Sequence, residues 1–273
     1  MMATINAYRM DGLGNDFIII DRRENSIEIS KNKIIELGNR DNIGFDQIIL
    51  IEKKQKNVFP ITIYNSDGGE VSACGNGARC VAYLLSEKLS SKNIELKTNN
   101  RILNAKVVED FLVELEMGKP LFGSKEIPLS KTVDPSNISL EIDNKIFNSG
   151  FCVNVGNPHI VFFVKDCFEN NLKVIGPKIE NHELFPDRIN VTFAQMIDRE
   201  NILVNVWERG AGLTKACGTA ACATAVAALK NKISERRVDI KFKEGFLSIE
   251  IDKDENIFMT GPVSKVKNIN IEV

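Results

Sequence analysis

An internal repeat runs along this sequence and limits the folds that the chain can adopt. The segment ACGNGARC at residues 73–80 is echoed by ACGTAACA at residues 216–223. Other matched positions recur at almost the same separation, since Cys217 lies 143 residues after Cys74. The further pairs are Gly14-Asn15 with Gly156-Asn157, Gln47 with Asn190, Asn65 with Glu208, and residues 117–120 with 259–262. In a chain of 273 residues, this repeat predicts two domains of similar fold, each with its own core.

Each copy of the motif places a cysteine before a run of small and apolar residues, which is typical of a buried helix. The first NH groups of a helix have no internal partner, and the helix dipole adds positive potential there. A cysteine at this position, with an ordinary pKa near ~8.5, is therefore expected to form a thiolate more readily. Two equivalent units packed face to face would bring Cys74 and Cys217 to one cleft.

The hydrophobic pattern predicts a meander of strands around one helix in each unit. In the first unit we expect a hairpin over 5–20, helices over 30–38 and from 78 to about 90, and strands over 47–51, 58–64, 94–98, 101–108 and 111–116. In the second unit we expect strands over 145–155, 159–164, 190–195 and 201–207, and a helix over 218–230. Residues 121–142 are expected to connect the units, and residues 166–188 to form a polar insertion. By symmetry, the last strand should return to the first unit, giving domains of 1–118 plus 263–273 and 119–262.

Composition favours a small-molecule partner. The net charge is −2 with basic residues spread throughout, so we expect neither a nucleic-acid partner nor a membrane partner. The N-terminus shows no secretory signal, and nowhere do about 18 apolar residues stand together, so a cytoplasmic location is expected. The six cysteines are then reduced, none stands in a Cys-x-x-Cys motif, and a metal site is not expected. Cys80, Cys152, Cys167 and Cys222 are expected to be small buried apolar residues.

Five ordered segments resemble the diaminopimelate epimerase family and together span nearly the whole chain. They are MDGLGNDFIIID, DGGEVSACGNGARC, NVGNPHIVFF, PDRINVTFAQ and WERGAGLTKACGTAACA. The resemblance implies an isomerase that converts LL- to meso-2,6-diaminopimelate, on the route to lysine and peptidoglycan, without a cofactor. It also implies a mixed α+β fold of two pseudo-symmetric domains, each a curved, mostly antiparallel sheet around a central helix, with the active site in the cleft between them.

The family also implies roles for particular residues. One of Cys74 and Cys217 removes the α-proton as a thiolate, and the other returns a proton to the opposite face as a thiol. The substrate α-carboxylate would be held by the backbone NH groups of Gly75, Asn76, Gly218 and Thr219. The distal amino acid end would be recognised by Asn15, Asn65, Asn157, Asn190 and Arg209, with Gln47 as a weaker assignment. Glu208 would receive the reacting ammonium group, and His159 would assist electrostatically or as a proton neighbour.

These assignments have simpler alternatives. A Glu-Arg pair at a strand end is usually a surface ion pair, an Asn beside Gly is usually a turn residue, and a single His is often structural. The sequence also departs from the family pattern at Ala220, whose methyl could narrow the substrate site, and at Leu213.

Three other functions fit parts of the pattern. A proline racemase relative would have the same fold, but typically carries His where this chain has Asn76. A hydrolase using one cysteine with His159 would form an acyl adduct. A non-catalytic amino-acid binder would not exchange the Cα proton. The oligomeric state stays open between a monomer and a homodimer.

Overall fold

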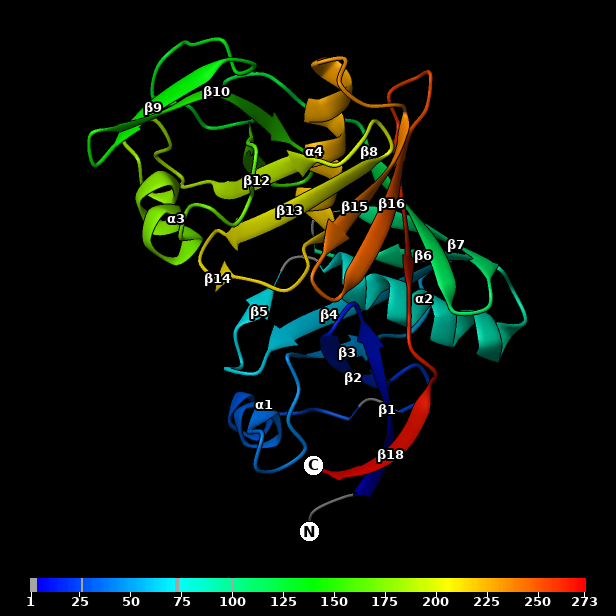
Figure 1. Ribbon diagram of the computed structural model, residues 1–273. Helices are drawn as coiled ribbons and strands as arrows, with labels where there is room; N and C mark the ends of the chain where they lie inside the picture. The colour runs from blue at the N-terminus through cyan, green and yellow to red at the C-terminus, as the bar shows by residue number, and fades with distance from the viewer. Residues whose placement is uncertain (1–3, 26, 72–73, 100) are drawn as a thin grey trace. The chain divides into compact units, whose positions relative to one another are not determined.

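The computed structural model describes residues 4–25, 27–71, 74–99 and 101–273, and the chain forms two compact units. The N-terminal unit comprises Met1–Leu115 and Thr260–Val273, and the C-terminal unit comprises Glu116–Met259. In each unit, a mostly antiparallel sheet packs against a central helix (Figure 1). The predicted mixed α+β fold is confirmed.

In the N-terminal unit, the strands pair in the order β18, β1, β2, β3, β4, β6, β7 and β8, and β5 lies beside β4. The strands are β1 (Thr4–Gly12), β2 (Asn15–Asp21), β3 (Gln47–Ile51), β4 (Val58–Asn65), β5 (Glu70–Val71), β6 (Asn93–Lys97), β7 (Ile102–Glu109), β8 (Leu112–Gly118) and β18 (Lys267–Glu272). The β2–β3 and β4–β6 pairs are parallel, and the other pairs are antiparallel. The last strand pairs with β1 and so belongs to this unit, as the repeat predicted.

The C-terminal unit repeats this plan with the order β9, β10, β11, β12, β13, β15 and β16, and β14 lies beside β13. The strands are β9 (Ile138–Ile142), β10 (Lys145–Asn154), β11 (Pro158–Phe163), β12 (Asn190–Met196), β13 (Asn201–Glu208), β14 (Gly212–Leu213), β15 (Arg237–Phe242), β16 (Gly245–Ile251) and β17 (Ile257–Pro262). The β11–β12 and β13–β15 pairs are parallel, at the positions that β2–β3 and β4–β6 occupy in the other unit. The pairing pattern therefore carries the same duplication as the sequence.

The central helices are α2 (Gly75–Leu89) in the N-terminal unit and α4 (Gly218–Lys230) in the C-terminal unit. Helix α2 packs against β1, β2, β3, β6 and β7, and α4 packs against β10, β11, β12, β15 and β16. All residues from Ala220 to Ala228 are buried, because small side chains let strands approach from several sides. In α2, a Cβ atom at Gly77 would lie 2.6 Å from Ile49 Cδ1, so only glycine fits there without a shift. These contacts fix the start of each helix against its sheet.

Helix α1 (Lys31–Gly38) confirms the predicted short helix, and Ser30 Oγ accepts a hydrogen bond from Lys33 N at 3.2 Å. Helix α2 begins at Gly75, three residues earlier than predicted, because Cys74 itself is the N-cap. The turn-forming Gly-Asn-Gly sequence concealed this first turn.

Two other predictions were wrong. The segment predicted as a polar insertion contains α3 (Leu172–Glu180), which lies between β11 and β12 in the chain just as α1 lies between β2 and β3. It is thus the counterpart of α1, and the Gly176-Pro177 pair inside it hid the helix. The predicted connector ends in β9, whose alternating burial was masked by the neighbouring proline and serine residues.

Candidate active site

Cys74 is the N-cap of α2 and is half-buried. Its Sγ accepts a hydrogen bond from Gly77 N at 3.4 Å and lies 3.8 Å from the side-chain oxygen of Asn15, to which the thiol donates. Asn15 is the first residue of β2, directly after the tight turn of the first hairpin. The hairpin therefore delivers a polar acceptor to the predicted reactive sulfur.

Asp46 fixes the orientation of the Asn15 amide. Its Oδ2 accepts hydrogen bonds from Asn15 Nδ2 at 2.9 Å and from Asp16 N at 3.1 Å. A carboxylate can only accept here, so the amide nitrogen of Asn15 faces Asp46 and the amide oxygen faces Cys74. Arg40 in turn donates to Asp46 Oδ1 at 2.6 Å. Asp46 was not among the predicted site residues, and its position next to Gln47 at a strand start was the available signal.

The other predicted amides of this unit lie at the same end of the central strands. Gln47 begins β3 and is paired across the strands with Asn65, which ends β4. Gln47 Nε2 donates to Asn65 Oδ1 at 3.0 Å. The Gln47 Oε1 atom is buried without a hydrogen-bond partner among the described residues. The antiparallel register of β3 and β4 places these two side chains next to each other.

Cys217 is the N-cap of α4 and occupies the position equivalent to Cys74, with a similar backbone conformation. It is 5% exposed, and its Sγ lies 3.4 Å from Thr219 Oγ1. Burial raises the pKa of the Cys217 thiol well above its ordinary range, and the neighbouring Glu208 charge raises it further. For this cysteine, burial outweighs the helix N-terminus that led us to expect an easily formed thiolate.

Glu208 ends β13 and is half-buried beside Cys217. Burial raises the pKa of its carboxyl group, while the nearby Thr214 hydroxyl and Cys217 thiol lower it. These strand ends match those of the other unit. Glu208 at the end of β13 corresponds to Asn65, and Asn190 at the start of β12 corresponds to Gln47. The structure thus places Cys217, Glu208 and Asn190 at the same end of the C-terminal sheet.

His159 lies in β11, directly opposite Asn190 in the register, and is completely buried. Burial, followed by the positive charge of Arg209, lowers its pKa to about 3. Its Nε2 lies 2.8 Å from Asn157 Oδ1, and its Nδ1 has no hydrogen-bond partner among the described residues. At neutral pH the ring is uncharged, so a positive imidazolium does not contribute to this site.

Asn190 uses both ends of its amide within the protein. Its Nδ2 donates to Pro158 O at 2.7 Å, and its Oδ1 accepts from the backbone N of Arg209 at 2.9 Å. The Arg209 guanidinium donates from Nη1 to Asp187 O at 2.9 Å. Asn190 therefore joins the start of β11 to the turn that carries Arg209.

The four residues predicted to offer backbone NH groups occupy the first two positions of α2 and α4. They are Gly75, Asn76, Gly218 and Thr219. The side-chain oxygen of Asn76 accepts from Arg79 Nη2 at 2.8 Å. A Cβ atom at Gly218 would lie 2.9 Å from Met259 Sδ, so a larger residue there would displace the end of the methionine side chain.

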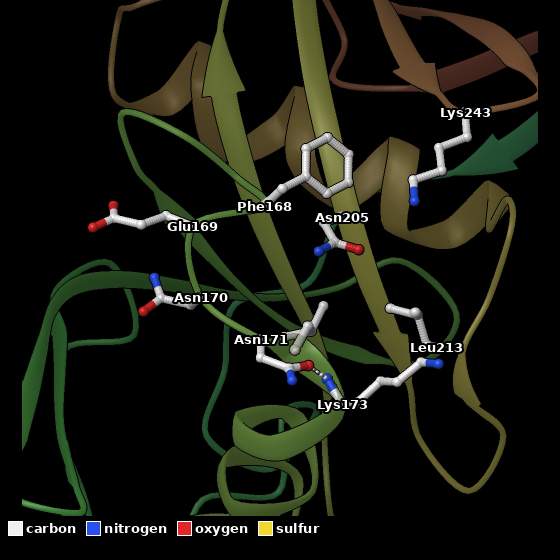
Figure 2. A pocket seen from close by; sticks show the side chains of 9 residues that line it. Phe168, Glu169, Asn170, Asn171, Lys173, Asn205, Leu213 and Lys243 are labelled. Carbon is white, nitrogen blue, oxygen red and sulfur yellow. Dashed lines mark hydrogen bonds between the residues drawn. The ribbon is translucent and has the colours of Figure 1, made fainter.

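The two departures from the family pattern lie in different surroundings. Ala220 is completely buried in the first turn of α4, and Leu213 is 41% exposed on β14. Leu213 lines an open pocket of about 250 Å³ (Figure 2). The other lining residues are Phe168, Glu169, Asn170, Asn171, Leu172, Lys173, Asn205 and Lys243. None of the predicted catalytic or substrate-binding residues lines this pocket.

The remaining cysteines are buried, as predicted. Burial raises the pKa of Cys80 and Cys152, and it raises that of Cys167 to about 11. Within the described part of the chain, no cluster of three or more His, Cys, Asp or Glu residues could hold a metal ion. No helix in those same residues is long and apolar enough to cross a membrane.

Comparison with solved structures places this fold among known ones. A hydroxyproline epimerase from Agrobacterium vitis matches with a TM-score of 0.68 at 11% identity, covering 99% of this chain and 93% of that one. A predicted epimerase from Pseudomonas aeruginosa matches with a TM-score of 0.67 at 15% identity, covering 98% and 99%. The two-unit α+β fold is therefore that of this group of epimerases.

Sequence comparison is more specific. The family model described as diaminopimelate epimerase matches residues 7–122 and 151–266. A diaminopimelate epimerase from Pelagibacter ubique is 52% identical over 272 residues, covering 98% of this chain and 99% of the relative. One from Acidiphilium cryptum is 38% identical over 259 residues, covering 94% and 93%. The chain belongs to the diaminopimelate epimerase family, and it is an isomerase.

Proposed function

We propose that this enzyme converts LL-2,6-diaminopimelate to meso-2,6-diaminopimelate by a two-base reaction that uses no added cofactor. The observation that carries the proposal is the matched pair of cysteines. Cys74 caps α2 and Cys217 caps α4 at equivalent positions of the repeat. Inversion at Cα requires a proton to leave one face and another to arrive at the opposite face, which calls for two such groups.

In this reaction, Cys74 and Cys217 act as proton acceptor and proton donor, and they exchange roles in the reverse direction. The raised pKa of Cys217 favours its thiol form, which suits it to donate the proton. Negative charge that spreads onto the substrate α-carboxylate is stabilised by the NH groups at the starts of α2 and α4. Glu208 receives the ammonium group at the reacting centre.

The distal end of the substrate sets specificity in this proposal. Arg209 offers a planar fork for the second carboxylate, and amides from both units supply donors and acceptors. These amides are Asn15, Gln47, Asn65, Asn157 and Asn190. A substrate that lacks the distal amino acid leaves such groups without partners, at a cost of about 1 to 3 kcal/mol each. This cost would separate diaminopimelate from ordinary amino acids.

The proposal is tested by incubating LL-diaminopimelate with the purified enzyme in deuterium oxide, with no cofactor added. We expect deuterium at Cα together with the appearance of the meso isomer. Faster turnover of proline than of diaminopimelate would instead indicate a proline racemase. Binding without deuterium incorporation would indicate an amino-acid binder, and a covalent acyl adduct on one cysteine would indicate a hydrolase.

The proposal also covers the cellular location, the domain boundaries and the oligomeric state of the enzyme. We place the reaction in the cytoplasm, where thiols stay reduced. We assign residues 1–118 and 263–273 to the domain of Cys74 and residues 119–262 to the domain of Cys217. Light scattering would decide between the monomer and the homodimer that the sequence leaves open.

A further inference from the structure

We propose that Glu180 is a positioning residue that holds the segment Trp207–Gly210, and with it Glu208 and Arg209, in the geometry needed to bind substrate. The inference rests on the proposed function of Glu208 and Arg209. Glu180 itself does not touch substrate in this proposal. It acts through the backbone and the indole ring on either side of the two ligands.

Glu180 is the last residue of α3, and it is only 4% exposed. Its Oε2 accepts a hydrogen bond from Trp207 Nε1 at 2.6 Å, and its Oε1 accepts from Gly210 N at 2.9 Å. Arg188 Nη1 lies 3.4 Å from the same Oε1. One carboxylate therefore ties down both ends of the four-residue segment.

A carboxylate is costly to bury unless its oxygens are hydrogen-bonded and its charge is offset. Both conditions are met, by the two N–H donors and by the Arg188 guanidinium. The two donors flank Glu208 and Arg209 in the chain, so a loss of either contact frees one side of the ligand pair. Gly210 has φ of 77°, a left-handed conformation that favours glycine and turns the chain after Arg209.

Packing of α3 supports the same segment. A Cβ atom at Gly176 would lie 2.6 Å from two carbons of the Trp207 indole ring, so the helix backbone lies directly on the ring. The N-terminal unit has a related arrangement, since a Cβ atom at Gly38 of α1 would lie 2.8 Å from Ser66 Cβ, in the turn after β4. In both units the helix between the parallel strands packs against a residue next to a predicted ligand, Ser66 beside Asn65 and Trp207 beside Glu208. The C-terminal unit adds the Glu180 carboxylate to this contact.

The test uses Glu180→Gln in the full-length enzyme, with Glu183→Gln as the matched control. Glu183 is exposed, lies three residues away and makes no hydrogen bond to Trp207 or Gly210. Trp207 is the sole tryptophan of the sequence, so its fluorescence reports on this contact without substrate. A glutamine has one acceptor oxygen, so its NH2 group must face one of the two N–H donors.

We expect the KM of Glu180→Gln for diaminopimelate to rise about 10-fold, with a much smaller change in kcat, because one buried hydrogen bond to a charged acceptor is lost. The emission maximum should shift to shorter wavelength, because a negative charge near the indole nitrogen stabilises the excited state. The control should match the wild type in both readouts. Kinetic constants of Glu180→Gln equal to those of the wild type, or a loss of stability alone, would overturn the inference.

A second variant keeps the test decisive if Glu180→Gln does not fold. Trp207→Phe removes the indole donor and leaves the carboxylate in place, and we expect it to raise KM in the same direction. An unchanged KM in Trp207→Phe would overturn the inference. Where Glu180→Gln folds, the effects on KM in the double variant should be less than additive, because both changes remove one shared contact. Strict additivity would overturn the inference. A wild-type enzyme that fails to turn over diaminopimelate would count against the proposed function instead, while the emission shift still tests the Glu180 contact.

Discussion

Asn190→Ala should destabilise the C-terminal unit as well as weaken substrate binding. The Asn190 side chain is 2% exposed, and its removal leaves Pro158 O and Arg209 N without their partners. Each such buried group costs about 1 to 3 kcal/mol. Water can reach the half-buried Arg209 more easily than Pro158, so we expect a total loss of about 2 to 4 kcal/mol. This corresponds to a drop in melting temperature of roughly 5 to 15 °C for a unit of this size.

The loss can be measured by urea unfolding followed by Trp207 fluorescence, which reports on the C-terminal unit that contains it. Asn137→Ala is the matched control, because Asn137 is exposed in the same unit and its side chain has no hydrogen bond among the described residues. We also expect Asn190→Asp to lose stability, since its second oxygen would face Pro158 O. An Asn190→Ala variant whose free energy of unfolding lies within about 0.5 kcal/mol of the control's would refute this reasoning. Ordinary surface substitutions change that free energy by about the same amount.

Four more predictions concern residues of the site. Cys74→Ala and Cys217→Ala should each reduce epimerisation by more than the ~10² to 10⁴ typical of one general acid or base, and retention of several per cent activity by either variant would contradict the two-base reaction. Lysine, which lacks the second carboxylate, should be turned over at least ~10³-fold less efficiently than diaminopimelate. Arg209→Lys should lose most activity, since an ammonium group cannot reproduce the planar fork; near-normal kcat/KM in that variant would make Arg209 a structural residue. His159 has its pKa lowered from 6.5 to about 3, so the unfolded chain binds the proton first as pH falls, and stability should be lost below about pH 6.5. Urea unfolding at pH 8 and pH 5 should show about 2 kcal/mol of this loss in the wild type and not in His159→Gln; equal pH dependence would contradict the buried neutral ring.

Much of the candidate site follows from local sequence, because its predicted ligands lie at the ends of strands and helices. The Ala-Cys-Gly motifs predicted cysteines at helix starts, and both are N-caps. The repeat also predicted the return of the last strand to the N-terminal unit, where it pairs with β1. These features depend on short-range patterns and on the comparison of two copies within one chain.

The sequence alone did not predict the protonation states of Cys217 and His159. A helix N-terminus favours a thiolate, yet burial and the Glu208 charge together raise the pKa of Cys217. His159 likewise reads as a residue that could carry charge, and its complete burial makes it neutral. Solvation depends on what surrounds a group from every side, and motif spacing does not contain that information.

The supporting residues were also decided by the tertiary structure alone. Asp46 orients the Asn15 amide across a separation of 31 positions, and Glu180 reaches Trp207 across 27. No local periodicity links such pairs, and α3 itself was hidden by its internal Gly176-Pro177 pair. The sequence determined the two-fold plan, most of the strands and the two cysteine positions, because these arise from hydrophobic period, turn chemistry and duplication. Only the packed structure decided which carboxylate holds which predicted ligand, because hydrogen bonds between distant segments form after the sheets and helices have come together.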